Sequence, residues 1–173
     1  SCFPKDRRAL NASFKKNGVK STLIESVIEF NENRKLNMVY KVKELLGFRL
    51  NGKTISFLGV TFKPNTDDIR ESSSLVIIPS LIKAGAVVKA HDPAFTNNFK
   101  YFKEFEKVKW NKNVFNTIKD SDLLIIHTEW NEYRAVDLKK TRRLLKHPNI
   151  LDLRNIFKKS EMIKLGFNYK SIG

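Results

Sequence analysis

Cysteine is almost absent from this 173-residue chain, and so are long hydrophobic runs. The single cysteine, Cys2, excludes an intramolecular disulfide framework and is typical of a protein in a reducing cytosol. No stretch of eighteen apolar residues exists, because Pro79, Lys83 and Gly85 interrupt the richest run, residues 75–88. A membrane-spanning helix is therefore excluded, and no signal peptide is visible. The sequence predicts a cytoplasmic protein with no membrane partner.

Acidic residues are also scarce: 18 Asp and Glu stand against 33 Lys and Arg, which gives a formal net charge of +15. Dedicated nucleic-acid surfaces concentrate basic residues on one stripe, with aromatic residues between them. Here the lysines are scattered along the whole chain. This distribution favours a general shift of amino-acid composition toward lysine as the source of the charge, and it predicts no nucleic-acid partner. The alternative to this interpretation of the charge is a stand-alone nucleotide- or nucleic-acid-binding module, which would bind nucleic acid in a steeply salt-dependent way.

Glycine is sparse as well: the seven glycines form neither a G-x-G-x-x-G fingerprint nor a Walker loop. The histidines, His91, His127 and His147, are too far apart for metal-ligand spacing, so no metal site is predicted. What the chain does have is a globular composition, with 41% hydrophobic and 11% aromatic residues. Its length fits one ordinary domain or one and a half small ones.

Two helices are expected at the start of the chain, which has no initiator methionine, as if cut inside a longer protein. Proline suits the first helical position, so a short helix should begin at Pro4 and end at about Lys16. A second helix is expected over residues 21–48, where apolar residues recur at helical spacing toward both ends. Ser21 or Thr22 could cap this helix, with a capping-box glutamate three residues later. Its length predicts a connector between domains or a dimer contact.

From Lys53 onward, strands and helices alternate. Strands are predicted at residues 54–60, 87–91, 108–110, 123–127, 150–153 and 167–170, and helices at residues 68–84, 114–120, 138–145 and 160–165. Pro79 is expected to kink or split the first of these helices. Such alternation produces right-handed βαβ crossovers. The predicted fold class is therefore α/β: a long connecting helix followed by a doubly wound, mostly parallel, Rossmann-like sheet.

Cys2 is the first candidate for chemistry. A cysteine at a helix N-terminus beside Lys5 has two causes for a lowered thiol pKa, the helix dipole and the neighbouring cation. Asp6, expected in the first turn of the helix, could orient or deprotonate a water molecule. A small buried cysteine and a routine helical aspartate remain the alternative interpretation.

The loop after the first predicted strand is the second candidate. In doubly wound sheets, ligands bind at the carboxyl ends of the strands. There, Gly59 permits close backbone approach, and Lys63 and Arg70 supply cations for an anion, although ordinary solvated loop charges would look the same. Asp92 and Glu129 end other strands near this edge, and a turn or helix-cap role is favoured for both.

Two long motifs resemble one known family. Residues 1–6, Ser-Cys-Phe-Pro-Lys-Asp, resemble the cysteine motif of the UDP-glucose 6-dehydrogenases. Residues 59–72, Gly-Val-Thr-Phe-Lys-Pro-Asn-Thr-Asp-Asp-Ile-Arg-Glu-Ser, resemble the nucleotide-sugar loop of the same family. Shorter matches are Ala90-His91-Asp92-Pro93, His127-Thr128-Glu129-Trp130 and Leu151-Asp152-Leu153-Arg154. Because they follow the family's order over essentially the whole chain, the chain resembles the UDP-glucose/GDP-mannose dehydrogenases, and the UDP-glucose branch in particular.

The resemblance implies an NAD-dependent enzyme that oxidises the C6 alcohol of UDP-glucose twice, to UDP-glucuronate. It implies that Cys2 is the nucleophile, which forms a thiohemiacetal with the aldehyde and then carries a thioester. It also implies that Asp6 assists the water that hydrolyses the thioester. By the same resemblance, the residues that contact NAD are Lys5 and Arg70, and those that contact the nucleotide sugar are Phe62, Lys63 and Arg154.

The resemblance also predicts what this sequence does not hold. The family's N-terminal NAD-binding Rossmann domain, with its glycine-rich fingerprint, has no counterpart in the 173 residues. Residues 1–52 are then the end of the catalytic motif and a central helical dimerisation segment, and residues 53–173 are the UDP-sugar-binding domain. A homodimer through the central helix is expected, with no oxidation of UDP-glucose by this chain alone. A related substrate, UDP-N-acetylmannosamine or GDP-mannose, remains the alternative.

Overall fold

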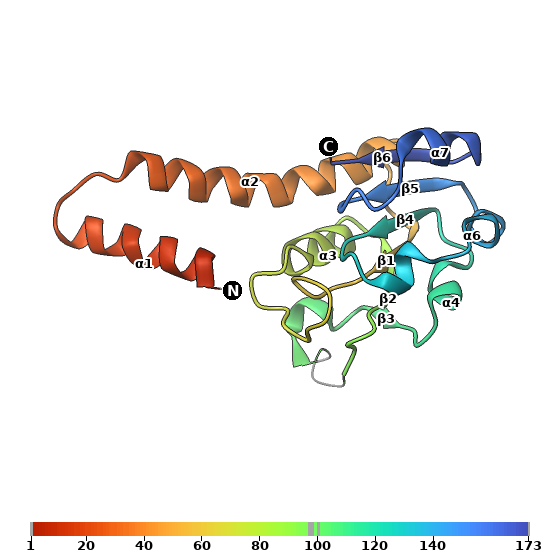
Figure 1. Cartoon of the computed structure of the whole chain (residues 1–173), viewed down its shortest axis with the longest axis horizontal. Coiled ribbons are helices and arrows are strands. Elements are labelled where there is room, and N and C mark those ends of the chain that lie inside the picture. The colour runs from red at the N-terminus through yellow and green to blue at the C-terminus, as the bar shows by residue number, and fades with distance from the viewer. Residues whose placement is uncertain (1, 97–98, 100, 173) are drawn as a thin grey trace.

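A helical hairpin projects from an α/β body (Figure 1). The computed structural model describes residues 2–96, 99 and 101–172; within residues 2–8, Asp6 is the residue whose side chain is described. The hairpin consists of α1 (Cys2–Lys16) and α2 (Thr22–Leu45), which run in opposite directions. The two helices are joined by an ion pair of 3.3 Å from Lys15 to Glu25.

Both predicted helices are confirmed, with three corrections. α1 already begins at Cys2, so Asp6 lies beyond its first turn. The capping box of α2 is wrong, because the Ser21 hydroxyl donates to the Asn11 side chain at 2.5 Å instead of bonding the helix backbone. α2 ends at Leu45 rather than near residue 48, where Gly47 and Phe48 both adopt positive φ angles, 65° and 61°. A left-handed backbone of this kind ends a helix.

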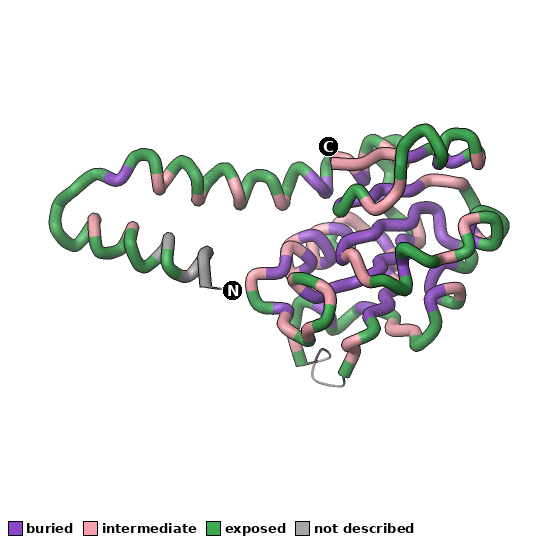
Figure 2. The backbone as a smooth tube through the Cα atoms, viewed as in Figure 1, coloured by how far each residue is buried: buried purple, intermediate pink, exposed green. Residues whose placement is uncertain are grey.

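α2 is anchored in the body at its C-terminal end and is mostly exposed elsewhere. Met38, Val39 and Val42 are buried in the core of the body. Toward the other end, large apolar side chains face solvent: Leu23 is 79% exposed and Phe30 65%. Most of α2 carries the colour of exposed residues in Figure 2. Among the described residues, no helix combines the length and the apolarity that crossing a membrane requires.

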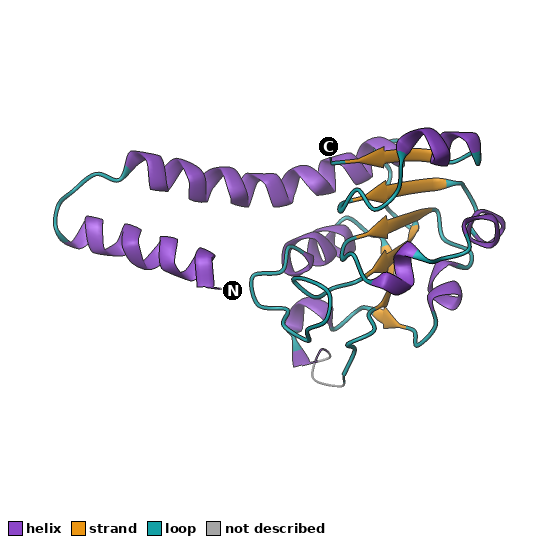
Figure 3. Cartoon of the chain, in the orientation of Figure 1, coloured by secondary structure: helices purple, strands orange, loops and turns teal. Residues whose placement is uncertain are grey.

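The body is built on a six-stranded sheet in which every pairing is parallel (Figure 3). The strands are β1 (Thr54–Leu58), β2 (Val87–His91), β3 (Lys109–Trp110), β4 (Leu123–Ile126), β5 (Asn149–Asp152) and β6 (Asn168–Ser171). Their order is β3-β2-β1-β4-β5-β6, which is the doubly wound Rossmann order. The predicted fold class is thus confirmed. The order reverses between β1 and β4, where such sheets bind ligands.

Helices cover both faces of the sheet (Figure 3). They are α3 (Ser74–Lys83), α4 (Val114–Ile118), α5 (Asn131–Arg134), α6 (Leu138–Leu144) and α7 (Lys159–Lys164), with the 3₁₀ helix η2 (Lys103–Phe105). Four of the five α-helices match predicted ones; α5 and η2 were not predicted. α3 runs unbroken through Pro79, so the expected split is wrong.

The main error concerns residues 68–73, which were predicted as the first part of α3. They are irregular because Glu71 has a φ of 62° and the hydroxyls of Ser72 and Ser74 both donate to the Val60 carbonyl, at 2.7 Å each. These long-range hydrogen bonds tie the segment to the loop after β1 and delay the helix until Ser74.

Two apolar clusters hold the layers together. Alternate residues of a strand face opposite sides of a sheet. Accordingly, Leu123 and Ile125 of β4 belong to the cluster under α2 and α3, and Leu124 and Ile126 belong to the cluster under α4 and α7. Because β4 is buried on both faces, it reads as a continuous apolar run in the sequence.

Candidate functional site

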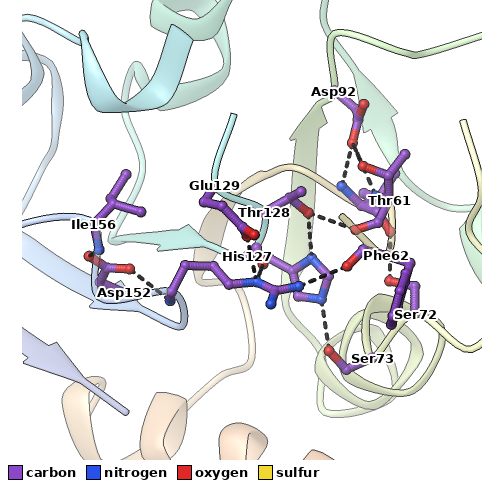
Figure 4. A network of polar contacts seen from close by, with 12 residues as sticks. Thr61, Phe62, Ser72, Ser73, Asp92, His127, Thr128, Glu129, Asp152 and Ile156 are labelled. Carbon is purple, nitrogen blue, oxygen red and sulfur yellow. Dashed lines mark hydrogen bonds and ion pairs between the residues drawn. The ribbon is translucent and has the colours of Figure 1, made fainter. Parts of the chain in front are cut away.

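The candidate site lies at the switch point, where the loops after β1, β4 and β5 meet (Figure 4). The loop after β1 approaches the loop after β4 very closely at Gly59, whose φ is 82°. A Cβ atom added at Gly59 would lie 2.4 Å from Cβ of Thr128. The hydroxyl of Thr128 donates to the Thr61 carbonyl at 2.8 Å and holds the two loops together.

Asp92, at the end of β2, fixes the start of the loop after β1. Its Oδ2 accepts hydrogen bonds from the backbone N–H groups of Val60 and Thr61, at 2.7 and 3.1 Å. Its Oδ1 accepts from the N–H of Ala94 at 2.9 Å. The turn role predicted for Asp92 is therefore confirmed.

Arg154 joins the three loops. Its Nη2 donates to the carbonyl of Phe62 at 2.8 Å, and its Nε donates to the carbonyl of His127 at 2.8 Å. Phe62 and Arg154 were both predicted to contact substrate from separate motifs, and the fold brings them together across 92 residues of sequence. Asp152 supports Arg154 by accepting from its backbone N–H at 2.9 Å.

Lys63 and Arg70 lie on the same loop but differ in their surroundings. Lys63 is exposed, and its ammonium group forms no ion pair with any residue that the structure describes. Arg70 is 78% exposed and forms a two-pronged contact with Asp68, at 3.0 and 3.1 Å. Hydrogen bonding to Arg70 lowers the pKa of the Asp68 carboxyl, and the same contact raises the pKa of Arg70.

The residues predicted from the cysteine motif lie on α1. The side chains of Cys2 and Lys5 are outside the described part of the chain, so their predicted contacts stay predictions. Asp6 is described and exposed. Across the described residues, no group of three His, Cys, Asp or Glu side chains could hold a metal ion.

His127 is a site residue that sequence reasoning missed. Burial, together with the positive charge of Arg154, lowers its pKa to about 3, so the ring is neutral. The Thr128 hydroxyl uses its proton on Thr61 and must accept from Nδ1–H of His127, at 3.1 Å. Nε2 is then the acceptor for the Ser73 hydroxyl at 2.8 Å. The signal that could have found His127 is its place directly after a buried parallel strand.

A cavity of about 270 Å³ opens between α2 and this edge of the sheet. α2 contributes Arg34 and Lys35, and the sheet edge contributes Ser73, His127 and Arg154. The role of α2 in this cavity was not predicted either. The polar middle of its sequence, residues 31–37, was a signal for it.

Glu129 corrects a further expectation. It neither caps a helix nor closes a turn: α5 begins two residues later, with Trp130 at its N-cap position. Instead, Oε2 of Glu129 lies 3.0 Å from Nε of Arg154. Glu129 therefore belongs to the group of residues around Arg154.

Comparison with known proteins identifies the family that the sequence motifs resemble. The family model of the UDP-glucose/GDP-mannose dehydrogenase family, UDP binding domain, matches residues 56–159. The UDP-glucose 6-dehydrogenase of Rickettsia bellii and UDP-glucose 6-dehydrogenase TuaD of Bacillus subtilis are each 42% identical over all 173 residues. The chain covers 40% and 37% of these relatives, so it spans about 40% of their length.

Solved structures agree. A UDP-glucose dehydrogenase from Pyrobaculum islandicum superimposes with a TM-score of 0.79 at 29% identity, covering 93% of this chain and 35% of that one. An NDP-N-acetyl-D-galactosaminuronic acid dehydrogenase from Methanosarcina mazei gives 0.70 at 27% identity, covering 87% and 30%. From the family model, the relatives and the doubly wound sheet, this chain belongs to the UDP-glucose/GDP-mannose dehydrogenase family and contains its UDP-binding domain.

Proposed function

We propose that this chain is the UDP-sugar-binding part, with the catalytic cysteine segment, of an NAD-dependent UDP-glucose 6-dehydrogenase. The observation that carries the proposal is the meeting of Phe62 and Arg154 at the switch point of the sheet, beside a cavity of about 270 Å³. In open α/β sheets this is the place where nucleotides bind. The UDP-glucose 6-dehydrogenases that match over the whole chain support the same substrate.

In this proposal, Lys63 and Arg154 bind the diphosphate of the nucleotide sugar. Both are cations at the carboxyl edge, and Lys63 is exposed with no ion pair to a described residue that would compete for it. The backbone carbonyl of Phe62, the residue next to Lys63 in sequence, accepts a hydrogen bond from Arg154, and the ring of Phe62 is the proposed contact for an apolar face of the ligand. Arginine and phosphate match in planar, two-pronged geometry.

The chemistry proposed for Cys2 starts from the aldehyde that the first oxidation of the C6 alcohol produces. The thiolate adds to the aldehyde and gives a thiohemiacetal; loss of a hydride and a proton then leaves a thioester. Water, assisted by Asp6, hydrolyses the thioester to the carboxylate and returns the thiol. NAD would supply the hydride acceptor for both oxidations.

Lys5 and Arg70 are the proposed NAD contacts. The exposed guanidinium of Arg70 suits a dinucleotide diphosphate. The described loop after β1 is not itself a diphosphate cradle, because Gly59 packs against Thr128 and leaves no space there. We therefore assign this chain a contribution to the NAD site rather than the whole of it.

The proposed organisation follows from these assignments. Residues 1–52 carry the cysteine segment and the helix that forms a homodimer, and residues 53–173 carry the nucleotide-sugar domain. The exposed apolar side chains of α2, among them Leu23 and Phe30, support a helix-mediated dimer because such groups gain from burial against a second copy.

Calorimetric titration of the 173-residue chain with UDP tests the proposal. We expect saturable binding that Lys63→Ala weakens by about tenfold, because a charge-assisted contact to phosphate is lost. Lys164→Ala, which removes an exposed lysine from α7, is the matched control and should bind like the unmodified chain. Equal affinity of the two variants, or no UDP binding, would contradict the proposal.

Two further measurements define the substrate. UDP-glucose should displace UDP more effectively than GDP-mannose or UDP-N-acetylmannosamine does; the opposite order would favour the related dehydrogenases. The chain alone, mixed with UDP-glucose and NAD, should produce no NADH absorbance. Turnover would contradict the assignment of the main NAD site to residues outside these 173.

A further inference from the structure

Glu129, whose side chain is partly exposed, places one buried carboxylate oxygen beside Arg154. Its Oε2 is inaccessible to solvent and accepts no hydrogen bond from any described residue, although it lies 3.0 Å from Nε of Arg154. Nε has one hydrogen, which it donates to the His127 carbonyl at 2.8 Å. The contact between Glu129 and Arg154 is therefore an ion pair, and the arginine charge is what compensates the buried oxygen.

The two carbonyl contacts determine which edge of the Arg154 guanidinium is used by the protein. Nε and Nη2 form one of its two forked edges, and they donate to the His127 and Phe62 carbonyls. The other forked edge, formed by Nη1 and Nη2, remains for a ligand. Arg154 lines the cavity between α2 and the sheet, and an end-on guanidinium can bind a phosphate through two parallel hydrogen bonds.

We propose that Glu129 is a positioning residue that keeps Arg154 oriented for the diphosphate of the nucleotide sugar. The inference rests on the proposed function, because it assigns Arg154 to that diphosphate. Its physical basis is that any movement of the guanidinium away from Glu129 leaves a buried carboxylate oxygen without a compensating charge, which is unfavourable. The partly exposed arginine side chain, 34% accessible, would otherwise have freedom to leave the two neutral carbonyls.

The direction in which one substitution changes UDP affinity distinguishes a positioning role from a purely electrostatic effect. Glu129→Gln removes a negative charge near the ligand, so electrostatics alone predicts tighter binding of anionic UDP. Positioning predicts the opposite, a loss of about three- to tenfold in UDP affinity. Glu132→Gln removes the same charge from an exposed position three residues away and is the matched control, expected to leave UDP affinity unchanged or slightly higher.

A double variant tests whether Glu129 acts through Arg154. Arg154→Lys cannot form the two-pronged contact and should weaken UDP binding by itself. In the Arg154→Lys background, Glu129→Gln should cause no further loss. The proposal would be overturned if Glu129→Gln reduced UDP affinity as much in the Arg154→Lys background as it does alone. It would also be overturned if Glu129→Gln alone bound UDP as tightly as the unmodified chain.

A measurement without ligand keeps the proposal separate from the proposed function. The Nε–H resonance of Arg154, assigned by its loss in Arg154→Lys, should exchange slowly with water in the unmodified chain and at least about tenfold faster in Glu129→Gln. If UDP does not bind at all, the proposed function fails while this readout still decides the role of Glu129. Unchanged exchange, or unfolding of Glu129→Gln in its amide spectrum, would refute positioning.

Discussion

Gly59 allows the loops after β1 and β4 to touch. Two demands coincide at this residue: a φ of 82°, and a contact so close that an added Cβ would lie 2.4 Å from Thr128. Gly52 has a similar φ, 74°, but open space around it. Substitutions at Gly59 and Gly52 can therefore distinguish the cost of the left-handed backbone, which both residues share, from the cost of steric crowding, which only Gly59 has.

We expect Gly59→Ala to destabilise the chain by about 2–4 kcal/mol, of which about 1 kcal/mol is the left-handed backbone and the rest overpacking. Gly52→Ala should cost only about 1 kcal/mol. Urea unfolding of both variants measures the difference. Equal losses would mean that the loops separate readily and that the close approach at Gly59 is not required.

His127 makes stability depend on pH. Its folded pKa of about 3 lies below the ordinary value of 6.5, so the unfolded chain binds a proton that the folded chain does not. The contribution of His127 to the free energy of unfolding is therefore fully present above pH 6.5. It is lost as the pH falls toward 3, by about 1.4 kcal/mol per pH unit for one such group.

His127→Gln should remove that contribution. Unfolding measured between pH 6.5 and 4.5 should show a shallower loss in the variant than in the unmodified chain. Burial also lowers the pKa of His91, which adds to the slope in both proteins and cancels in the comparison. Parallel curves would exclude His127 as the source.

At the scale of elements, the loop after β5 is held by one carboxylate. Asp152 accepts from the backbone N–H groups of Ile156 and Phe157, at 2.8 and 3.2 Å, and from the hydroxyl of Tyr169 on β6 at 2.8 Å. It also accepts from the N–H of Arg154. The carboxylate thus ties β5, its loop and β6 together and fixes the backbone that presents Arg154.

Asp152→Asn places an amide where the donors need an acceptor, so we expect a loss of about 2–4 kcal/mol in unfolding free energy and weaker UDP binding. Tyr169→Phe removes one donor and should cost about 1 kcal/mol with little effect on UDP affinity. Thermal unfolding and UDP titration of both variants measure this. A tolerated Asp152→Asn would mean that the loop is held by other contacts.

At the scale of the whole molecule, the exposed face of α2 predicts assembly. Phe30→Glu places a charge in the proposed contact between copies, so we expect a dimer to become a monomer in size-exclusion chromatography with light scattering. Ile163→Glu, at a comparably exposed position on α7, should leave the mass unchanged. A monomeric unmodified chain would refute the proposed dimer.

Most elements could be predicted from the sequence because local patterns specify them. Strands buried on both faces, such as β1 and β4, appear as short apolar runs, and the motif residues Phe62, Lys63 and Arg154 stand out by resemblance alone. Residues 68–73 were mispredicted because their local pattern is helical, whereas hydrogen bonds from Ser72 and Ser74 to Val60 hold them in another conformation. Those bonds depend on tertiary contacts.

Composition and periodicity alone therefore determined the α/β class, the long connecting helix and the absence of a glycine-rich dinucleotide fingerprint. Tertiary structure decided that Arg154 meets Phe62, that His127 is neutral beside Ser73, and that Glu129 pairs with Arg154. The physical reason is that strand order places distant loops at one edge of the sheet. Burial and charge compensation act only between groups that the fold has already brought into contact.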